Sequence, residues 1–272
     1  SLSLHGRRAG TDSARGPSRR AQVLRFYNRE AACNGVLLEL EDVQKGYPVR
    51  RWGREVSRVE ALRGLDLSVP EGAMFGFLGP NGAGKTTAIS CIVGILRADA
   101  GTIRLDGEPL DATSGRAEIG YLPEQVGLHG HLTAEETLQF YGTFHGLARD
   151  DIDARGGELL RQLGLAGETT RAVRGFSLGM RKRLAFARLL LQDPKIILLD
   201  EPYGQLDPSG FAFVDSLVEQ FIAEGRTLVL STHLLERASP LLRAELKATA
   251  SIVCACTASC HWPKTLSVAS NA

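Results

Sequence analysis

A run of small and polar residues has the composition and spacing of a loop that binds phosphate groups. It reads Gly79-Pro80-Asn81-Gly82-Ala83-Gly84-Lys85-Thr86-Thr87 and fits the pattern G-x-x-x-x-G-K-[ST]. The glycines let successive backbone N–H groups face a polyphosphate, Lys85 can reach the β and γ phosphates, and the Thr86 hydroxyl can bind Mg²⁺. An apolar run precedes the loop and a helix-like segment follows it, so the loop opens a helix whose N-terminus also attracts anions.

Two adjacent carboxylates form a second group that could do chemistry. Asp200 and Glu201 follow the apolar run Ile196 to Leu199, which predicts a buried strand. In a parallel α/β sheet, the carboxyl end of such a strand lies next to the phosphate loop. Asp200 is then placed to hold Mg²⁺, directly or through water, and Glu201 to polarise an attacking water.

The elements that must position these residues follow from hydrophobic patterning. Alternation predicts strands over Val36–Val43 and Ala61–Val69, joined by a polar, basic connection. That connection contains Pro48, Arg50, Arg51, Arg54 and Arg58. The next predicted elements are a strand over Ala73–Leu78, a helix over Lys85–Leu96 and a hairpin arm over Gly101–Gly107.

A mostly helical block separates two α/β parts. Thr133, three residues before Glu136, forms a capping box that opens a helix reaching Gly146. Further helices are expected over Ile152–Leu163, despite Gly156 and Gly157, and over Leu178–Leu191. The remaining predicted elements are the strands Lys195–Leu199 and Thr227–Leu230 and the helix Phe211–Glu224.

Composition narrows the class of protein. The chain has 272 residues, 43% of them hydrophobic and 23% charged, which is typical of a globular protein. Its formal net charge of +1 provides no argument for a nucleic-acid partner, and no apolar window is long enough to span a membrane. The five cysteines form no disulfide framework, so we expect a reducing cytosol.

The segment Phe176-Ser177-Leu178-Gly179-Met180 carries a family resemblance. With the phosphate loop and the two acids, it resembles the ATP-binding cassette (ABC) ATPases, whose signature runs Leu-Ser-Gly-Gly-Gln. Ser177 and Gly179 match, whereas Phe176, Leu178 and Met180 differ. The resemblance implies ATP and Mg²⁺ as cofactors, and it implies that Ser177 and Gly179 contact the γ phosphate of ATP held by an opposite subunit.

Other family positions fall on particular residues. Gly204-Gln205-Leu206-Asp207 resembles the family's D-loop, and the switch histidine falls on His233 in Ser231-Thr232-His233. A neutral imidazole at His233 could hydrogen-bond the γ phosphate. The aromatic that stacks on adenine falls on Tyr47, with Trp52 as the rival. The glutamine that normally contacts Mg²⁺ falls on Glu124 or on Gln125, and this alternative stays open.

The resemblance covers Val36 to Arg237 and implies a domain organisation. We expect an ABC ATPase domain over 36–238: a P-loop NTPase α/β core with a parallel-rich sheet, an antiparallel β arm and a helical subdomain inserted at about 125–180. Residues 1–35 are rich in arginine and predict a disordered basic tail. Residues 239–272 do not follow the family pattern, and we interpret them as an atypical, non-native tail that replaces the last core strands.

The resemblance implies a function. It indicates the ATP-binding and ATP-hydrolysing subunit of an exporter, working as a homodimer, or as a heterodimer with a second cassette. It would drive a separate transmembrane permease from the cytoplasmic face of the cell membrane. The alternatives are a soluble ABC ATPase that acts on ribosomes or DNA, and a truncated, inactive cassette. The sequence does not identify the cargo.

Overall fold

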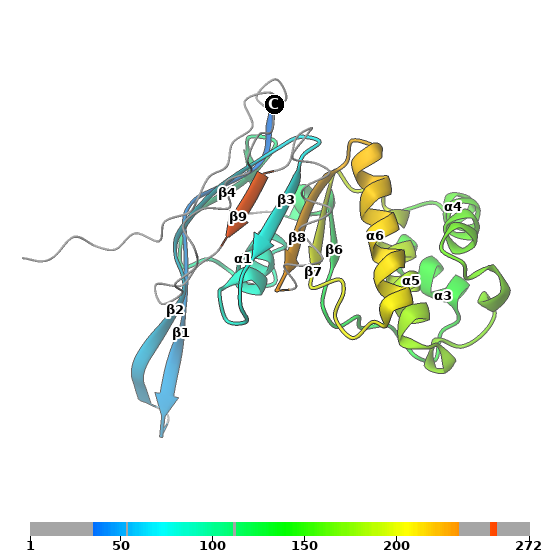
Figure 1. Cartoon of the computed structure of the whole chain (residues 1–272), viewed down its shortest axis with the longest axis horizontal. Helices are drawn as coiled ribbons and strands as arrows, with labels where there is room; N and C mark the ends of the chain where they lie inside the picture. Colours follow the sequence, from blue (N-terminus) through cyan, green and yellow to red (C-terminus); the bar gives the residue numbers. More distant parts are fainter. Residues whose placement is uncertain (1–34, 53, 111–112, 234–250, 255–272) are drawn as a thin grey trace, which may run out of the picture.

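The computed structural model describes residues 35–52, 54–110, 113–233 and 251–254 (Figure 1). The predicted basic tail, up to residue 34, lies outside the described residues. So does the atypical tail predicted at 239–272, except for residues 251–254.

A five-stranded parallel sheet forms the centre of the fold. Its strand order is β6-β7-β8-β3-β9, and all neighbouring strands are parallel. The strands are β6 (Ile119–Leu122), β7 (Ile196–Asp200), β8 (Thr227–Thr232), β3 (Met74–Leu78) and β9 (Ser251–Cys254). We expected the end of the chain to supply no core strand, and this expectation is wrong for β9. The strand β9 pairs with the edge of β3 that β8 leaves free.

The second sheet is the antiparallel arm. Its order is β2-β1-β4-β5, with β2 (Arg54–Pro70), β1 (Val36–Arg51), β4 (Ala100–Leu105) and β5 (Glu108–Pro109). The predicted basic connection is wrong: Pro48, Arg50, Arg51, Arg54 and Arg58 lie within β1 and β2. The two strands pair as far as Arg51 and Arg54, so cross-strand hydrogen bonds satisfy the backbone there. The polar residues of this segment lack the hydrophobic alternation that would have predicted a strand.

Helices flank the parallel sheet. The helix α1 (Lys85–Ile92) follows β3, whereas α5 (Leu178–Leu191) and α6 (Pro208–Ala223) lie on the side of the helical block (Figure 1). That block also contains α3 (Ala134–Phe144), α4 (Arg149–Gln162), and the short helical segments Ala166–Glu168 and Val173–Gly175. A short helix, α2 (Thr113–Arg116), precedes β6.

Local signals explain two of these helices. The capping box of α3 is confirmed, with the Glu136 N–H donating to Thr133 Oγ1 at 3.1 Å and the Thr133 N–H donating to Glu136 Oε2 at 2.8 Å. One of the two glycines inside α4 has a packing role, because a Cβ on Gly156 would lie 3.1 Å from Leu138 of α3, whereas one on Gly157 would meet nothing within 4 Å. The intrinsic cost of Gly156 is thus offset by close helix packing.

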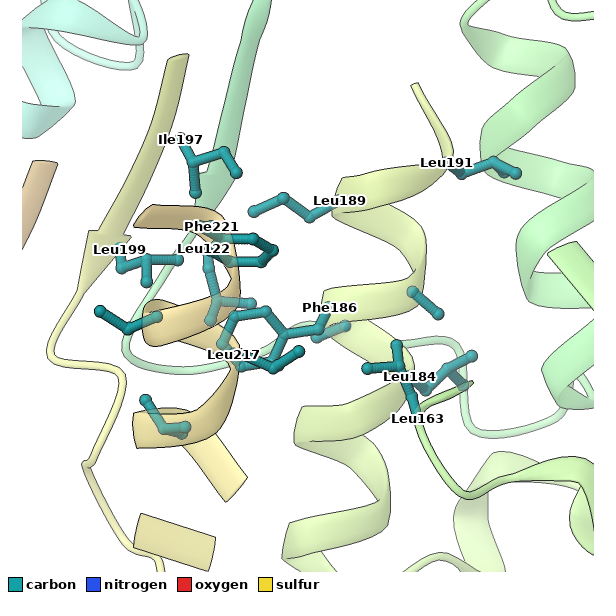
Figure 2. Packing of buried hydrophobic residues seen from close by; sticks show 14 of the residues in the cluster. Leu122, Leu163, Leu184, Phe186, Leu189, Leu191, Ile197, Leu199, Leu217 and Phe221 are labelled. Carbon is teal, nitrogen blue, oxygen red and sulfur yellow. The ribbon is translucent and has the colours of Figure 1, made fainter. Parts of the chain in front are cut away.

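Hydrophobic cores cover both faces of the parallel sheet. Ile197 and Leu199 of β7 face the helical block, where Phe186 of α5 and Phe221 of α6 converge on them (Figure 2). The alternate β7 residues belong to the other core, which β1, β2, α1 and β3 complete. Alternate burial on two sides explains why β7 is continuously apolar.

A carboxylate at the start of β4 holds the antiparallel arm together. Asp99 accepts hydrogen bonds from the Lys45 ammonium at 2.8 Å and the Gly46 N–H at 2.9 Å, and it pairs with Arg58 of β2. These bonds lower the pKa of Asp99 to about 2, the Lys45 bond contributing most. They fix the backbone just before Tyr47.

We expect Asp99→Asn to destabilise the protein at neutral pH. The folded-state pKa of Asp99 is below its unfolded value of about 3.9, so its contribution is present above that pH and is lost as the pH falls through about 2. Denaturant unfolding at pH 7 and at successively lower pH values measures the difference from wild type. Asp106→Asn, at an exposed turn, is the control. A difference that does not change with pH would contradict this account.

Candidate active site

The predicted phosphate loop joins β3 to α1. Gly82 and Gly84 adopt left-handed backbone angles, with φ of 82° and 90°. A Cβ on Gly84 would lie 2.7 Å from the carbonyl oxygen of Ala61 on β2. Only glycine fits there without strain. Position 84 is thus restricted both by its left-handed backbone and by its contact with the antiparallel arm.

Lys85 lies at the first position of α1 and is 5% exposed. Its Nζ donates to the carbonyl oxygens of Gly79 at 2.7 Å and Pro80 at 3.2 Å. It also lies 3.5 Å from Glu201 Oε1. The loop and the second acid therefore meet at one buried ammonium, a contact that the sequence analysis did not predict.

Asp200 ends β7 beside the loop. Its Oδ1 accepts hydrogen bonds from Thr86 Oγ1 at 3.2 Å and from Ser231 Oγ of β8. Sequence reasoning assigned Ser231 no role. Its position near the end of a strand that pairs with β7 could have indicated that it lies beside the acids. The carboxylate and the hydroxyl provide the hard oxygen ligands that Mg²⁺ prefers, so both predicted residues fit that ion.

Glu201 has a left-handed backbone, with φ of 46°. Such a conformation costs about 1–2 kcal/mol in a residue with a Cβ. The Glu201 N–H donates to the Ser231 carbonyl oxygen at 3.0 Å and to Ser231 Oγ at 3.1 Å, which holds the turn. His233 Nδ1 lies 2.9 Å from Glu201 Oε2, and the His233 N–H donates to the same oxygen at 3.3 Å. The turn thus directs the carboxylate towards both Lys85 and His233.

The two candidate aromatics lie at different distances from the loop. Tyr47 Oη lies 3.5 Å from Thr87 Oγ1, at the end of the phosphate loop. Trp52 lies at the tip of the β1–β2 hairpin and is 94% exposed. The geometry favours Tyr47 as the aromatic that faces a bound base.

A cavity of about 320 Å³ contains both candidates for the glutamine position. Glu124 and Gln125 line it together with Lys182 of α5 and the turn Gly204–Leu206. Burial lowers the pKa of Lys182 to about 8, a shift that the negative charges of Glu124 and Asp200 oppose. Burial also raises the pKa of Tyr121, on β6, to about 12, and the charge of Asp200 adds to this shift. Because Glu124 and Gln125 line the same cavity, its lining does not choose between them for the glutamine position.

The predicted residues of the signature and of the D-loop cap helices. Ser177 Oγ accepts from the Met180 N–H at 3.2 Å at the start of α5, where Gly179 also lies. Asp207 Oδ1 accepts from the Gly210 N–H at 2.8 Å at the start of α6. The hydrogen bonds from Gly210 and Ser209 lower the pKa of Asp207. Each cap residue bonds to the first turn of its own helix. Leu178, next to Ser177, is half-exposed.

Comparison with known protein families decides the family. The profile described as "ABC transporter" matches residues 62–204, from β2 through the phosphate loop to the turn after Glu201. The chain belongs to the ABC transporter family. Within it, the ABC ATPase fold places the loop, Asp200 and Glu201 in one site.

Curated relatives of this ABC chain include ATP-binding proteins of exporters. It is 38% identical over 197 residues to the ABC transporter ATP-binding protein NatA of Bacillus subtilis, covering 71% of this chain and 79% of the relative. It is 40% identical over 184 residues to the daunorubicin resistance ATP-binding protein DrrA3 of Streptomyces coeruleorubidus, covering 67% and 58%. It is 37% identical to the Nod factor export ATP-binding protein I of Ralstonia nicotianae, covering 75% and 62%. The chain thus spans about three fifths of the length of the last two relatives.

Solved structures agree with the ABC fold. An ATP-binding subunit of an ABC transporter aligns with a TM-score of 0.66 at 28% identity, covering 80% of this chain and 85% of that one. A dimeric ATP-binding cassette in a post-hydrolysis state, bound to ADP and Pi, aligns with the same TM-score at 26% identity, covering 74% and 90%. Among the described residues, no helix is long and apolar enough to cross a membrane.

We expect Lys85→Ala to weaken ATP binding by this ABC chain at least tenfold. Hydrogen bonds to a charged group contribute about 1.5–3 kcal/mol, and about 1.4 kcal/mol corresponds to tenfold in affinity. Isothermal titration with ATP measures the change. Lys195→Ala removes an exposed ammonium at the start of β7 and is the matched control. An unchanged ATP affinity in Lys85→Ala would contradict the role of the loop.

Replacing the two candidate aromatics separates them. Tyr47→Ala should weaken ATP binding about tenfold, because stacking of a base on an aromatic ring contributes about 1–3 kcal/mol. Tyr47→Phe keeps the ring and should bind ATP as wild type does. Trp52→Ala should have no effect, and the same titration measures all three variants. A loss confined to Trp52→Ala would reverse the assignment.

Proposed function

We propose that this chain is the ATP-binding and ATP-hydrolysing subunit of an ABC exporter, and that it powers a separate transmembrane partner. The observation that carries the proposal is the convergence of Lys85, Asp200, Glu201 and His233 at one edge of the parallel sheet. A phosphate loop next to an acid and a histidine is the arrangement that phosphoryl transfer to water needs.

Each side chain has a role in this proposal. Lys85 exchanges its contacts with Gly79, Pro80 and Glu201 for the β and γ phosphates, which offer stronger charge-assisted hydrogen bonds. Glu201 accepts a hydrogen bond from the attacking water and polarises it. His233 orients the Glu201 carboxylate through its bond to Oε2 and reaches the γ phosphate. The strained backbone of Glu201 keeps its carboxylate directed at this point.

The metal and the base complete the site. Thr86 and Asp200 would hold Mg²⁺, with Glu124 or Gln125 reaching it through water. When bound, the ion neutralises charge that develops on the phosphate oxygens. Tyr47 lies beside Thr87 and would stack on the adenine.

The second half of the catalytic site comes from another cassette. Ser177, Gly179 and Asp207 lie at helix N-termini, which are favourable places for anions, and they would contact ATP held by a second copy or by a related cassette. The dimeric cassette bound to ADP and Pi supports this arrangement.

Coupling to export rests on the relatives. Two of them are named for daunorubicin resistance and for Nod factor export, which supports an exporter without identifying the cargo. The partner would be a transmembrane permease, and this chain would then lie in the cytoplasm on the inner face of the cell membrane. The balanced net charge of +1 is consistent with a protein partner rather than a nucleic acid.

Glu201→Gln should bind Mg²⁺-ATP, lose turnover and accumulate as a dimer. The amide keeps the shape of the carboxylate but cannot polarise the water, so the sandwiched ATP is not consumed. Size exclusion with Mg²⁺-ATP and a phosphate-release assay measure both effects. Wild type with ATP, and Glu201→Gln without nucleotide, are the controls.

Adding Ser177→Ala to Glu201→Gln tests the composite site. The double variant should bind ATP as a monomer and form less dimer. Turnover retained in Glu201→Gln would reject Glu201 as the residue that activates water. Wild-type hydrolysis that is independent of protein concentration would reject the composite site.

A further inference from the structure

The helical block contains a buried cation that the catalytic roles above do not use. Lys182 is in the second turn of α5 and is 4% exposed. Its Nζ has no hydrogen-bond partner within the described part of the chain. A buried ammonium is costly unless carboxylates face it, so its surroundings carry information about its role.

The surroundings of Lys182 are acidic. It lines the same cavity as Glu124, at the turn that follows β6, and the charges of Glu124 and Asp200 both act on it. They partly offset the lowering of its pKa by burial, to about 8, so the ammonium stays predominantly charged at neutral pH. A buried cation on α5 and an acidic residue after β6 therefore line one cavity.

The neighbouring cations on α5 have hydrogen-bond partners of their own, although Arg181 also lines the cavity. Arg181 donates to the carbonyl oxygen of Arg174 at 3.2 Å. Arg183 donates to the carbonyl oxygen of Leu163 at 2.9 Å and stacks over the ring of Phe213. Of these three consecutive cations, Lys182 is the one whose charged group has no hydrogen-bond partner within the described residues.

We propose that Lys182 is a positioning residue, which attracts the Glu124 carboxylate across the cavity and sets the loop after β6 relative to Asp200. The inference rests on the proposed function, because it assigns Glu124 rather than Gln125 as the residue that this loop presents to the metal side of the site. Lys182 acts through Glu124 and does not itself touch the nucleotide.

The position of Lys182 on α5 gives this attraction a consequence. Ser177, the N-cap of the same helix, lies five residues earlier, a rise of about 8 Å along the axis. A displacement of α5 when a second cassette engages Ser177 would carry the ammonium with it. The loop that contains Glu124 would then respond to the state of the dimer through one rigid helix.

A double-mutant cycle tests the inference. The variants are Lys182→Met, Glu124→Gln and the combination of both, with Lys182→Arg as the conservative replacement that keeps the charge. Lys195→Met makes the same chemical change at an exposed site and is the matched control. For each variant, steady-state assays give kcat and KM for Mg²⁺-ATP, and denaturant titration gives the unfolding equilibrium constant.

Lys182→Met should lower kcat about tenfold, which corresponds to about 1.4 kcal/mol, and leave KM within about twofold, because the attraction across the cavity that positions the Glu124 loop is lost. In the Glu124→Gln background the same substitution should change kcat less than twofold. Lys182→Arg should restore most of the turnover. In the unfolding equilibrium constants, Lys182→Met should likewise have a smaller effect in the Glu124→Gln background than in wild type. This readout does not depend on ATP hydrolysis.

Contrary results have distinct meanings. An equal loss of kcat in both backgrounds, or additive unfolding constants, would overturn the positioning role and leave the ATPase intact. A loss of turnover in Lys195→Met as large as in Lys182→Met would also overturn it. Absence of hydrolysis in every variant and in wild type would reject the proposed function, whereas the unfolding cycle would still decide whether Lys182 and Glu124 interact.

Discussion

The site depends on the adjacency of three parallel strands, β7, β8 and β3. Parallel strands end at the same edge of a sheet, so the segments that follow them meet there although they are far apart in the sequence. The phosphate loop follows β3, Asp200 and Glu201 lie at the end of β7, and Ser231 and His233 lie at the end of β8. The order β7-β8-β3 therefore places the histidine strand between the acids and the loop.

Burial restricts which residues this edge of the sheet can hold. Lys85, Asp200 and Glu201 are each less than 10% exposed, and charged groups persist there only when they are paired or hydrogen-bonded. Ser231 bonds to Asp200 and to the Glu201 N–H, whereas Lys85 and His233 contact the Glu201 carboxylate. Each strand end thus satisfies polar groups of its neighbours, and the left-handed turn at Glu201 is held by that network.

Sequence reasoning succeeded where a signal was local. The helix starting after Thr133 and the helix from Leu178 to Leu191 were predicted correctly, because a capping box and a serine cap mark their starts. It failed for the residues between Val43 and Ala61, where strand pairing rather than hydrophobic alternation keeps the chain extended. It also gave no sign of β9, whose contribution arises from pairing with β3.

For the site, the order and types of residues by themselves predicted the phosphate loop and the two acids, because each sits in a short pattern at a strand end, and the family resemblance added the histidine. The sequence also favoured Tyr47 over Trp52 through the family resemblance, and it named Glu124 and Gln125 without choosing between them. Only the tertiary structure placed Tyr47 beside Thr87, brought Ser231 to Asp200 and put Lys182 and Glu124 on one cavity. The reason is physical: motif chemistry is encoded over a few consecutive residues, whereas burial, hydrogen bonding and the charges that a side chain faces depend on segments brought together by sheet order and helix packing.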